Sequence, residues 1–140
     1  MAIEIVVEPE FSRRVNRSAL RAAAAHALRS ERAPAKRDLA IVIVGDKTMR
    51  RLNADFHNVN APTDVLSFPS DDQDYYGDIV ISYETARANA RGARWRTRDE
   101  LELLVVHGLL HLLGYDDLAP EDRAKMWRRQ EKILGKRLKQ

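Results

Sequence analysis

The chain has 140 residues, of which 44% are hydrophobic and 32% are charged, and its net charge is +3. This length suits one domain with an ordinary core, so we expect residues 1–140 to form a single domain. The absence of cysteine excludes disulfide bonds and thiolate metal ligands. There is no signal-peptide core at the N-terminus and no apolar run long enough to cross a bilayer, so we expect a cytoplasmic protein with no membrane contact.

The first half of the chain predicts two strands and two helices. Residues 2–8 alternate between apolar and polar side chains, as a strand does. Residues 12–30 are rich in alanine and predict a helix, with Ser12 as its cap. Residues 39–44 are apolar on both faces, which is typical of a central strand, and a short helix is expected over 45–56.

The second half begins with two further strands. We expect them at 65–68 and 77–82, with an acidic loop over 69–76 between them. A helix then follows from Ser82 to about Gly92.

Two more helices complete the chain. A capping box over 97–100 begins a helix that is apolar almost all round and is therefore expected to be buried. The last helix begins at Pro120 and keeps helical spacing as far as Leu138. About four strands and about five helices, without strict alternation, predict an α+β fold with a mixed sheet.

The end of the buried helix carries the most informative motif, HGLLHLLGYDD. His107 and His111 are four residues apart, so on a helix they share one face. Gly114 allows the helix to stop in a left-handed cap, and Asp117, or alternatively Asp116, can then supply a third ligand. Three protein ligands leave one coordination position open, which is typical of catalytic zinc, so we expect one Zn²⁺ ion here.

This motif also has other interpretations, two of which require no metal. The two histidines could be core residues satisfied by their neighbours, although burying two imidazoles side by side is costly. Asp117 could merely cap the turn. The spacing also parallels zincin metalloproteases, but Gly108 occupies the position of their glutamate base, which argues against a protease of that design. We expect this glycine to make room for a bulky substrate group instead.

The motif resembles the signature of the YbeY family, bacterial endoribonucleases that mature ribosomal RNA. A second block agrees with that family, namely Leu52-Asn53 followed by PTDVLSF over 62–68 and by Gly77-Asp78-Ile79. The order and spacing of these blocks match over nearly the whole chain.

Two positions depart from the usual family pattern. Asp117 stands where the family has a third histidine, and His57 stands where it has an arginine. A carboxylate oxygen is a regular zinc ligand, but it widens the choice toward other divalent metals. His57 could contact a phosphate, donate a proton, reach the metal or be an ordinary loop residue. The resemblance makes His57 and Ser67 our candidates for catalytic residues that contact the substrate or support the ligands.

Basic residues form clusters that suit a polyanion. The candidates for RNA binding are Arg87, Arg91, Arg94, Arg123, Arg128 and Arg129. For any single residue, a solvated helix face is the simpler explanation. Aromatic residues are few, so shape and backbone contacts are expected to position the RNA.

Together these features predict a single-strand-selective, zinc-dependent endoribonuclease acting in ribosomal RNA maturation and ribosome quality control. Water or the ribose 2′-hydroxyl could be the nucleophile. The resemblance implies ribosomal RNA of the small subunit as substrate, and a ribosomal protein or a GTPase as partner. The alternatives are a zincin-like metallohydrolase or protease, and a non-catalytic ribosome-associated factor.

Overall fold

The computed structural model describes residues 2–34, 36–136 and 138. Its strands are β1 (Ile3–Val7), β2 (Asp38–Val44), β3 (Val65–Pro69) and β4 (Tyr75–Ser82). Its helices are the 3₁₀ helix η1 (Pro9–Arg14) and the α-helices α1 (Arg17–Ser30), α2 (Asp46–His57), α3 (Tyr83–Ala93), α4 (Thr97–Leu112) and α5 (Pro120–Leu134). These elements confirm the predicted α+β class.

The four strands form one mixed sheet in the order β1-β2-β4-β3. β1, β2 and β4 are parallel, whereas β3 pairs antiparallel with β4 and forms one edge. β3 and β4 are a hairpin, in which both strands extend further into the predicted acidic loop than expected, to Pro69 and from Tyr75.

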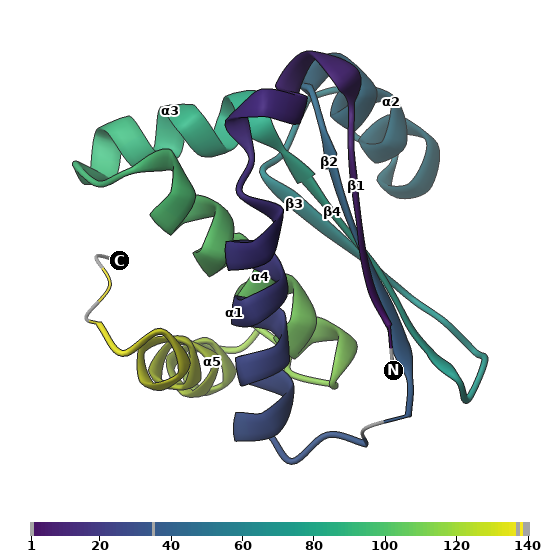
Figure 1. Ribbon diagram of the computed structural model, residues 1–140, viewed down its shortest axis with the longest axis vertical. Coiled ribbons are helices and arrows are strands. Elements are labelled where there is room, and N and C mark those ends of the chain that lie inside the picture. Colours follow the sequence, from purple (N-terminus) through teal and green to yellow (C-terminus); the bar gives the residue numbers. More distant parts are fainter. Residues whose placement is uncertain (1, 35, 137, 139–140) are drawn as a thin grey trace.

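The helices cover both faces of this sheet unequally. Figure 1 shows α1, α4 and α5 on one side of the sheet and α2 on the other. The larger core contains Ile41 and Ile43 of β2, which point toward α1 and α4. A smaller cluster contains Val44 of β2 and Met49 of α2 on the opposite face. Because successive strand residues point to opposite faces, the apolar run of β2 supplies both clusters, as expected of a central strand.

α4 is the central helix of the larger layer. It contacts α1, α3 and α5 and also packs on β3 and β4. Nine of its residues are buried, which confirms the prediction of a buried helix. The C-terminal end of this helix therefore has a fixed position beside the edge strand β3.

The first predicted helix begins later than expected. Ser12 lies inside η1, which Pro9 opens, and Val15 is extended and buried. The side chain of Asn16 accepts the backbone N–H of Ala19 at 3.0 Å and is the true cap of α1. Proline at the first position pre-sets a short helical turn, and the extended Val15 then prevents it from continuing into α1.

Two other helix ends also differ from the predictions. The cap of α4 is Arg96, whose backbone N–H donates to the Asp99 carboxylate at 3.1 Å, so the capping box lies one residue earlier than expected. α5 ends at Leu134 because Gly135 takes a φ of +69°, and Leu138 lies outside the helix although it is buried.

Within the part of the chain that the structure describes, no helix has both the length and the apolar character that a membrane crossing demands.

Candidate metal centre

The C-terminal end of α4 presents two imidazoles side by side. His107 and His111 lie one turn apart, and their ring centroids are 4.7 Å apart. Each side chain is 27% exposed, so the rings are half-buried and still reachable from solvent. Gly114 has a φ of +102°, a conformation that other residues rarely adopt, and it turns the chain back toward the histidines.

The returning chain places a carboxylate opposite the two rings. Asp117 Oδ2 lies 3.4 Å from His111 Nε2 and 3.9 Å from His107 Nε2. The three ligand atoms all lie within 4.8 Å of one another. A tetrahedral zinc ion with bonds of the usual length needs its ligand atoms about 3.3 Å apart, so small side-chain movements complete the site.

The structure distinguishes between the two aspartates of the motif. Asp116 Oδ1 accepts the backbone N–H of Leu118 at 2.9 Å and so stabilises the turn. Asp117 is the aspartate that faces the histidines. Asp116 is thus the residue that shapes the turn, and Asp117 is the one placed to be a ligand.

Hydrogen bonds at the far side of each ring fix which nitrogen is free. His107 Nδ1 lies 2.6 Å from Gln130 Oε1, and His111 Nδ1 lies 3.1 Å from the carbonyl oxygen of Tyr115. Both partners are acceptors, so each Nδ1 must carry the proton. The lone pairs of both Nε2 atoms therefore point toward Asp117, which is the support that metal-binding histidines usually have.

Burial also favours the neutral imidazole that a metal requires. Burial lowers the pKa of His107, and the proximity of His111 lowers it further, against an opposing effect of the hydrogen bond to Gln130. The residues present thus fit a divalent metal by donor set, tautomer and protonation state.

Gln130 is the residue of this site that the sequence did not reveal. It lies on α5, 23 residues after His107, and is only 2% exposed. The available signal was a polar residue at an apolar position of the last helix. That signal did not reveal its partner.

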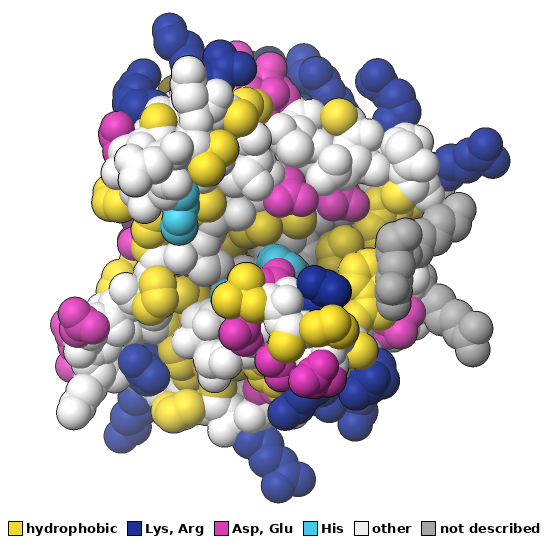
Figure 2. All heavy atoms as spheres, turned by 180° about the vertical axis from the view of Figure 1, so that it is seen from behind, with side chains coloured by type: hydrophobic (Ala, Val, Ile, Leu, Met, Phe, Trp, Pro, Cys, Tyr) yellow, Lys and Arg dark blue, Asp and Glu magenta, His cyan; other side chains and the backbone are white. Residues whose placement is uncertain are grey.

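The candidate ligands line a cleft of about 490 Å³ beside the edge strand β3. His57 and Ser67 line the same cleft, so the structure brings all five candidate catalytic and metal-binding residues together. Figure 2 shows a hollow in the middle of this face, with histidine side chains in and beside it and acidic side chains at its rim.

His57 and Ser67 differ in how free they are. His57 is the last residue of α2 and is exposed, so it is helical rather than a loop residue. Ser67 Oγ donates to the carbonyl oxygen of Gly108 at 3.0 Å and so links β3 to α4. The hydroxyl of Ser67 therefore holds the metal-bearing helix against the edge strand.

Gly108 serves the packing of α4 on the sheet. A Cβ atom at this position would lie 2.6 Å from Ile79 Cγ2 and 3.2 Å from Ser67 Oγ. The expectation that this glycine makes room for a substrate group is wrong, because the space beside it is filled by β3 and β4. The sheet also leaves no room here for the glutamate of a zincin.

The six candidate RNA-binding arginines lie on two helices and their ends. Arg87 and Arg91 are exposed on α3, and Arg94 follows at its C-terminal cap. Arg123 and Arg128 are exposed on α5. Arg129 is half-buried and pairs with Glu31, which joins α5 to the end of α1.

Comparisons with known proteins agree with this arrangement. The family model described as endoribonuclease YbeY matches residues 6–137. A Roseiflexus castenholzii protein named endoribonuclease YbeY is 38% identical over 95% of this chain and 91% of its own length. The chain belongs to the YbeY family.

Two further relatives support the family and its fold. A Chloroflexus aurantiacus endoribonuclease YbeY is 43% identical over 80% of each chain. The solution structure of a Thermotoga maritima protein has a TM-score of 0.64 and 28% identity, and the match covers 95% of this chain and 89% of that one. Both confirm the predicted resemblance.

Proposed function

We propose that this protein is a metal-dependent endoribonuclease that cleaves single-stranded RNA during ribosomal RNA maturation and ribosome quality control. The observation that carries the proposal is the convergence of two imidazole nitrogens and one carboxylate oxygen in an open cleft. Relatives named endoribonuclease supply the substrate class.

The residues of the cleft have separate roles in this proposal. His107, His111 and Asp117 hold one Zn²⁺, and the carboxylate also admits other divalent metals. When bound, the ion supplies a Lewis acid beside the phosphodiester and lowers the pKa of nearby water. His57 contacts a phosphate oxygen from the exposed end of α2, and Ser67 positions α4.

Exposed arginines provide the wider contact with RNA. Arg87, Arg91 and Arg94 on α3, together with Arg123 and Arg128 on α5, attract phosphates regardless of sequence. Arg129 is not part of the interface that we propose, because its guanidinium already donates to Glu31. Ribosomal RNA of the small subunit as substrate, a ribosomal protein or GTPase as partner and a cytoplasmic location belong to the same proposal.

The competing metalloprotease has a specific observation against it. Its general base would occupy position 108, where Ile79 and Ser67 leave no space for a side chain. The non-catalytic ribosome-associated factor remains as the other candidate, and it predicts RNA binding without cleavage.

Cleavage and binding measured on the same labelled RNA test the proposal. The metal-loaded protein should cut single-stranded RNA in preference to a matched duplex, and a chelator should abolish cutting. His111→Ala should reduce cleavage more than about 100-fold, beyond the effect of losing a supporting hydrogen bond, while RNA binding persists. His26→Ala removes an exposed histidine of α1 and serves as the matched control.

Three other results would contradict parts of this proposal. Cleavage that resists both the chelator and His111→Ala would refute the metal centre as the source of the activity. Intact binding without cleavage under zinc, manganese or magnesium would favour the non-catalytic factor. Arg87→Glu combined with Arg91→Glu should weaken binding, and unchanged binding would remove α3 from the interface.

A further inference from the structure

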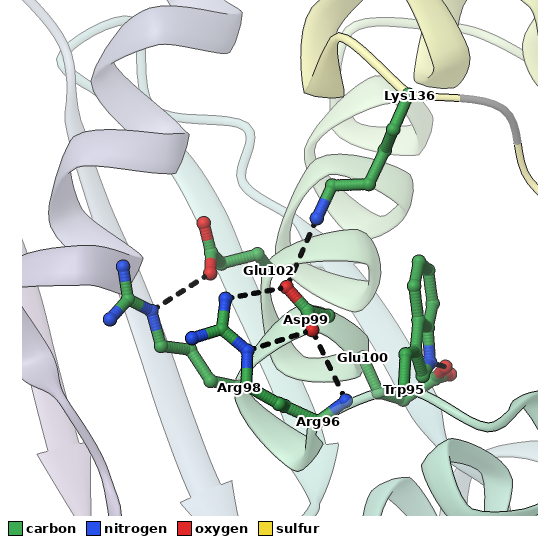
Figure 3. A network of polar contacts seen from close by, with 7 residues as sticks. All are labelled: Trp95, Arg96, Arg98, Asp99, Glu100, Glu102 and Lys136. Atoms are coloured by element: carbon green, nitrogen blue, oxygen red, sulfur yellow. Dashed lines mark hydrogen bonds and ion pairs between the residues drawn. The ribbon is translucent and has the colours of Figure 1, made fainter.

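A buried carboxylate in the first turn of α4 has no cationic partner among the residues that the structure describes. Glu100 is 5% exposed and forms no ion pair with the described residues. Its adjacent residue Asp99 instead takes both nearby cations, Arg96 and Lys136 (Figure 3). Burial of an anion without a charged partner costs several kcal/mol, so this position is unusual for a carboxylate with a purely structural role.

A neutral donor holds Glu100 in place. Trp95 Nε1 donates to Glu100 Oε1 at 3.0 Å, and Figure 3 shows the indole beside the carboxylate. The amide of Asn89 donates to Asp64 at 3.2 Å. Burial raises the pKa of Glu100, the hydrogen bond from Trp95 opposes that rise, and the nearby carboxylate of Asp64 adds to it.

Glu100 borders a hollow of about 460 Å³ between α3 and α4. We call it the α3–α4 pocket, and its lining includes Ala88, Asn89, Gly92, Trp95, Glu100 and Leu103. The lining is mostly small and apolar, with an aromatic ring and two polar groups. Small-molecule sites typically combine apolar and aromatic side chains with a few polar groups in this way.

The α3–α4 pocket and the metal cleft each share lining residues with a third hollow. A smaller hollow of about 180 Å³ shares Glu100 and Leu103 with the pocket and shares Asp64, Val65 and His107 with the cleft. Glu100 and His107 are seven residues apart on α4, which is about 10.5 Å along the axis. One nucleotide can therefore reach from the cleft to the pocket.

We propose that the α3–α4 pocket takes an unpaired guanine of the RNA whose neighbouring phosphodiester lies in the metal cleft. This rests on the proposed function and adds a base preference to it. A carboxylate has about four lone-pair positions, and the indole of Trp95 uses one of them, so acceptors remain free. Guanine alone presents two adjacent donors, N1–H and N2–H, on its Watson–Crick edge, whereas adenine places an acceptor at N1.

The pocket also gives a physical reason for single-strand selectivity. In a duplex, the Watson–Crick edge of guanine is already paired and cannot face Glu100. RNA-binding proteins read this edge in bases that are unstacked and held against aromatic side chains. Only a base that has left the helix can enter the space between α3 and α4.

Mapping of cleavage sites in a random single-stranded RNA library tests the preference. Wild-type protein should show guanine enriched about tenfold over adenine at one fixed position beside the cut. Glu100→Gln and Ala88→Leu, which fills the pocket from α3, should reduce that enrichment to below about twofold. Ala22→Leu places the same side chain on the exposed face of α1 and should keep the preference.

A second readout does not depend on catalysis. In Trp127→Phe protein, the indole N–H resonance of Trp95 should shift with guanosine monophosphate and not with adenosine monophosphate. Glu100→Gln should remove the shift. Equal shifts with both nucleotides, no shift with either, or cleavage without base preference would each overturn the pocket assignment and leave the nuclease proposal intact. A guanine-specific shift in a protein that cleaves no RNA would support the pocket and refute the nuclease.

Discussion

At the scale of single residues, some parts of the site could be predicted from the sequence and others could not. The spacing of His107 and His111 could be read directly, because helical periodicity places them on one face. Asp117 could be predicted as one of two alternatives. Gln130 could not be assigned, because the contact that fixes the His107 tautomer joins two helices 23 residues apart.

This hydrogen bond should control metal affinity. Gln130→Leu leaves His107 Nδ1–H without an acceptor, so zinc affinity should fall about 10–100-fold. Gln130→Glu keeps an acceptor of the same length and should retain the affinity of the wild type. Competition with a chromophoric chelator measures both, and circular dichroism checks the fold. Equal affinities in the leucine and glutamate variants would show that Gln130 does not orient the ring.

At the scale of elements, the packing of α4 on the hairpin decides what the motif can do. The apolar pattern predicted a buried helix, which is confirmed. Because this helix is apolar nearly all round, its pattern does not indicate which side faces the sheet. The sequence therefore did not show that position 108 faces Ile79 and Ser67. Gly108 was wrongly interpreted because the pattern does not indicate which side of α4 packs on the sheet.

A pair of glycine substitutions tests this packing. Gly108→Ala brings its methyl group 2.6 Å from Ile79 Cγ2, and overpacking should lower the free energy of unfolding by about 1–3 kcal/mol. Gly92→Ala on α3 meets nothing within 4 Å and should raise it by up to about 1 kcal/mol. Urea unfolding measures both. Two variants that are equally stabilised would contradict the close approach of α4 to the sheet.

At the scale of the whole molecule, the fold class followed from composition and periodicity, while the long-range ties did not. Glu31 pairs with Arg129 across 98 residues, and Asp99 receives Lys136 across 37. Local patterns carry no information on such pairs. Charge alone therefore groups Arg129 with the exposed arginines, although the structure pairs it with Glu31.

The Asp99 contacts should make the protein less stable in acid. Hydrogen bonding by Arg96 lowers the pKa of Asp99 from 3.8 to about 2. A lowered pKa stabilises the folded state above about pH 4, and this stability is lost as the pH falls toward 2. Because the Arg96 side chain is 70% exposed, the contribution is about 1 kcal/mol.

Asp99→Asn isolates this contribution from other carboxylates. The variant should be less stable than wild type at pH 6 and equally stable near pH 2, as measured by urea unfolding at both values. A difference in stability that stays constant between the two pH values would show that the charge of Asp99 is not responsible.

The three candidate ligands lie within eleven consecutive residues, but the contacts that hold this segment in place reach far outside it. Tyr115 supplies a carbonyl to His111, and its hydroxyl is held by Glu31 at the end of α1, 84 residues away. A synthetic peptide of residues 107–117 would thus contain every metal-donor atom. Its backbone and imidazole rings, however, would lose their conformational freedom only when the metal binds. The intact fold has completed that ordering before any ion arrives.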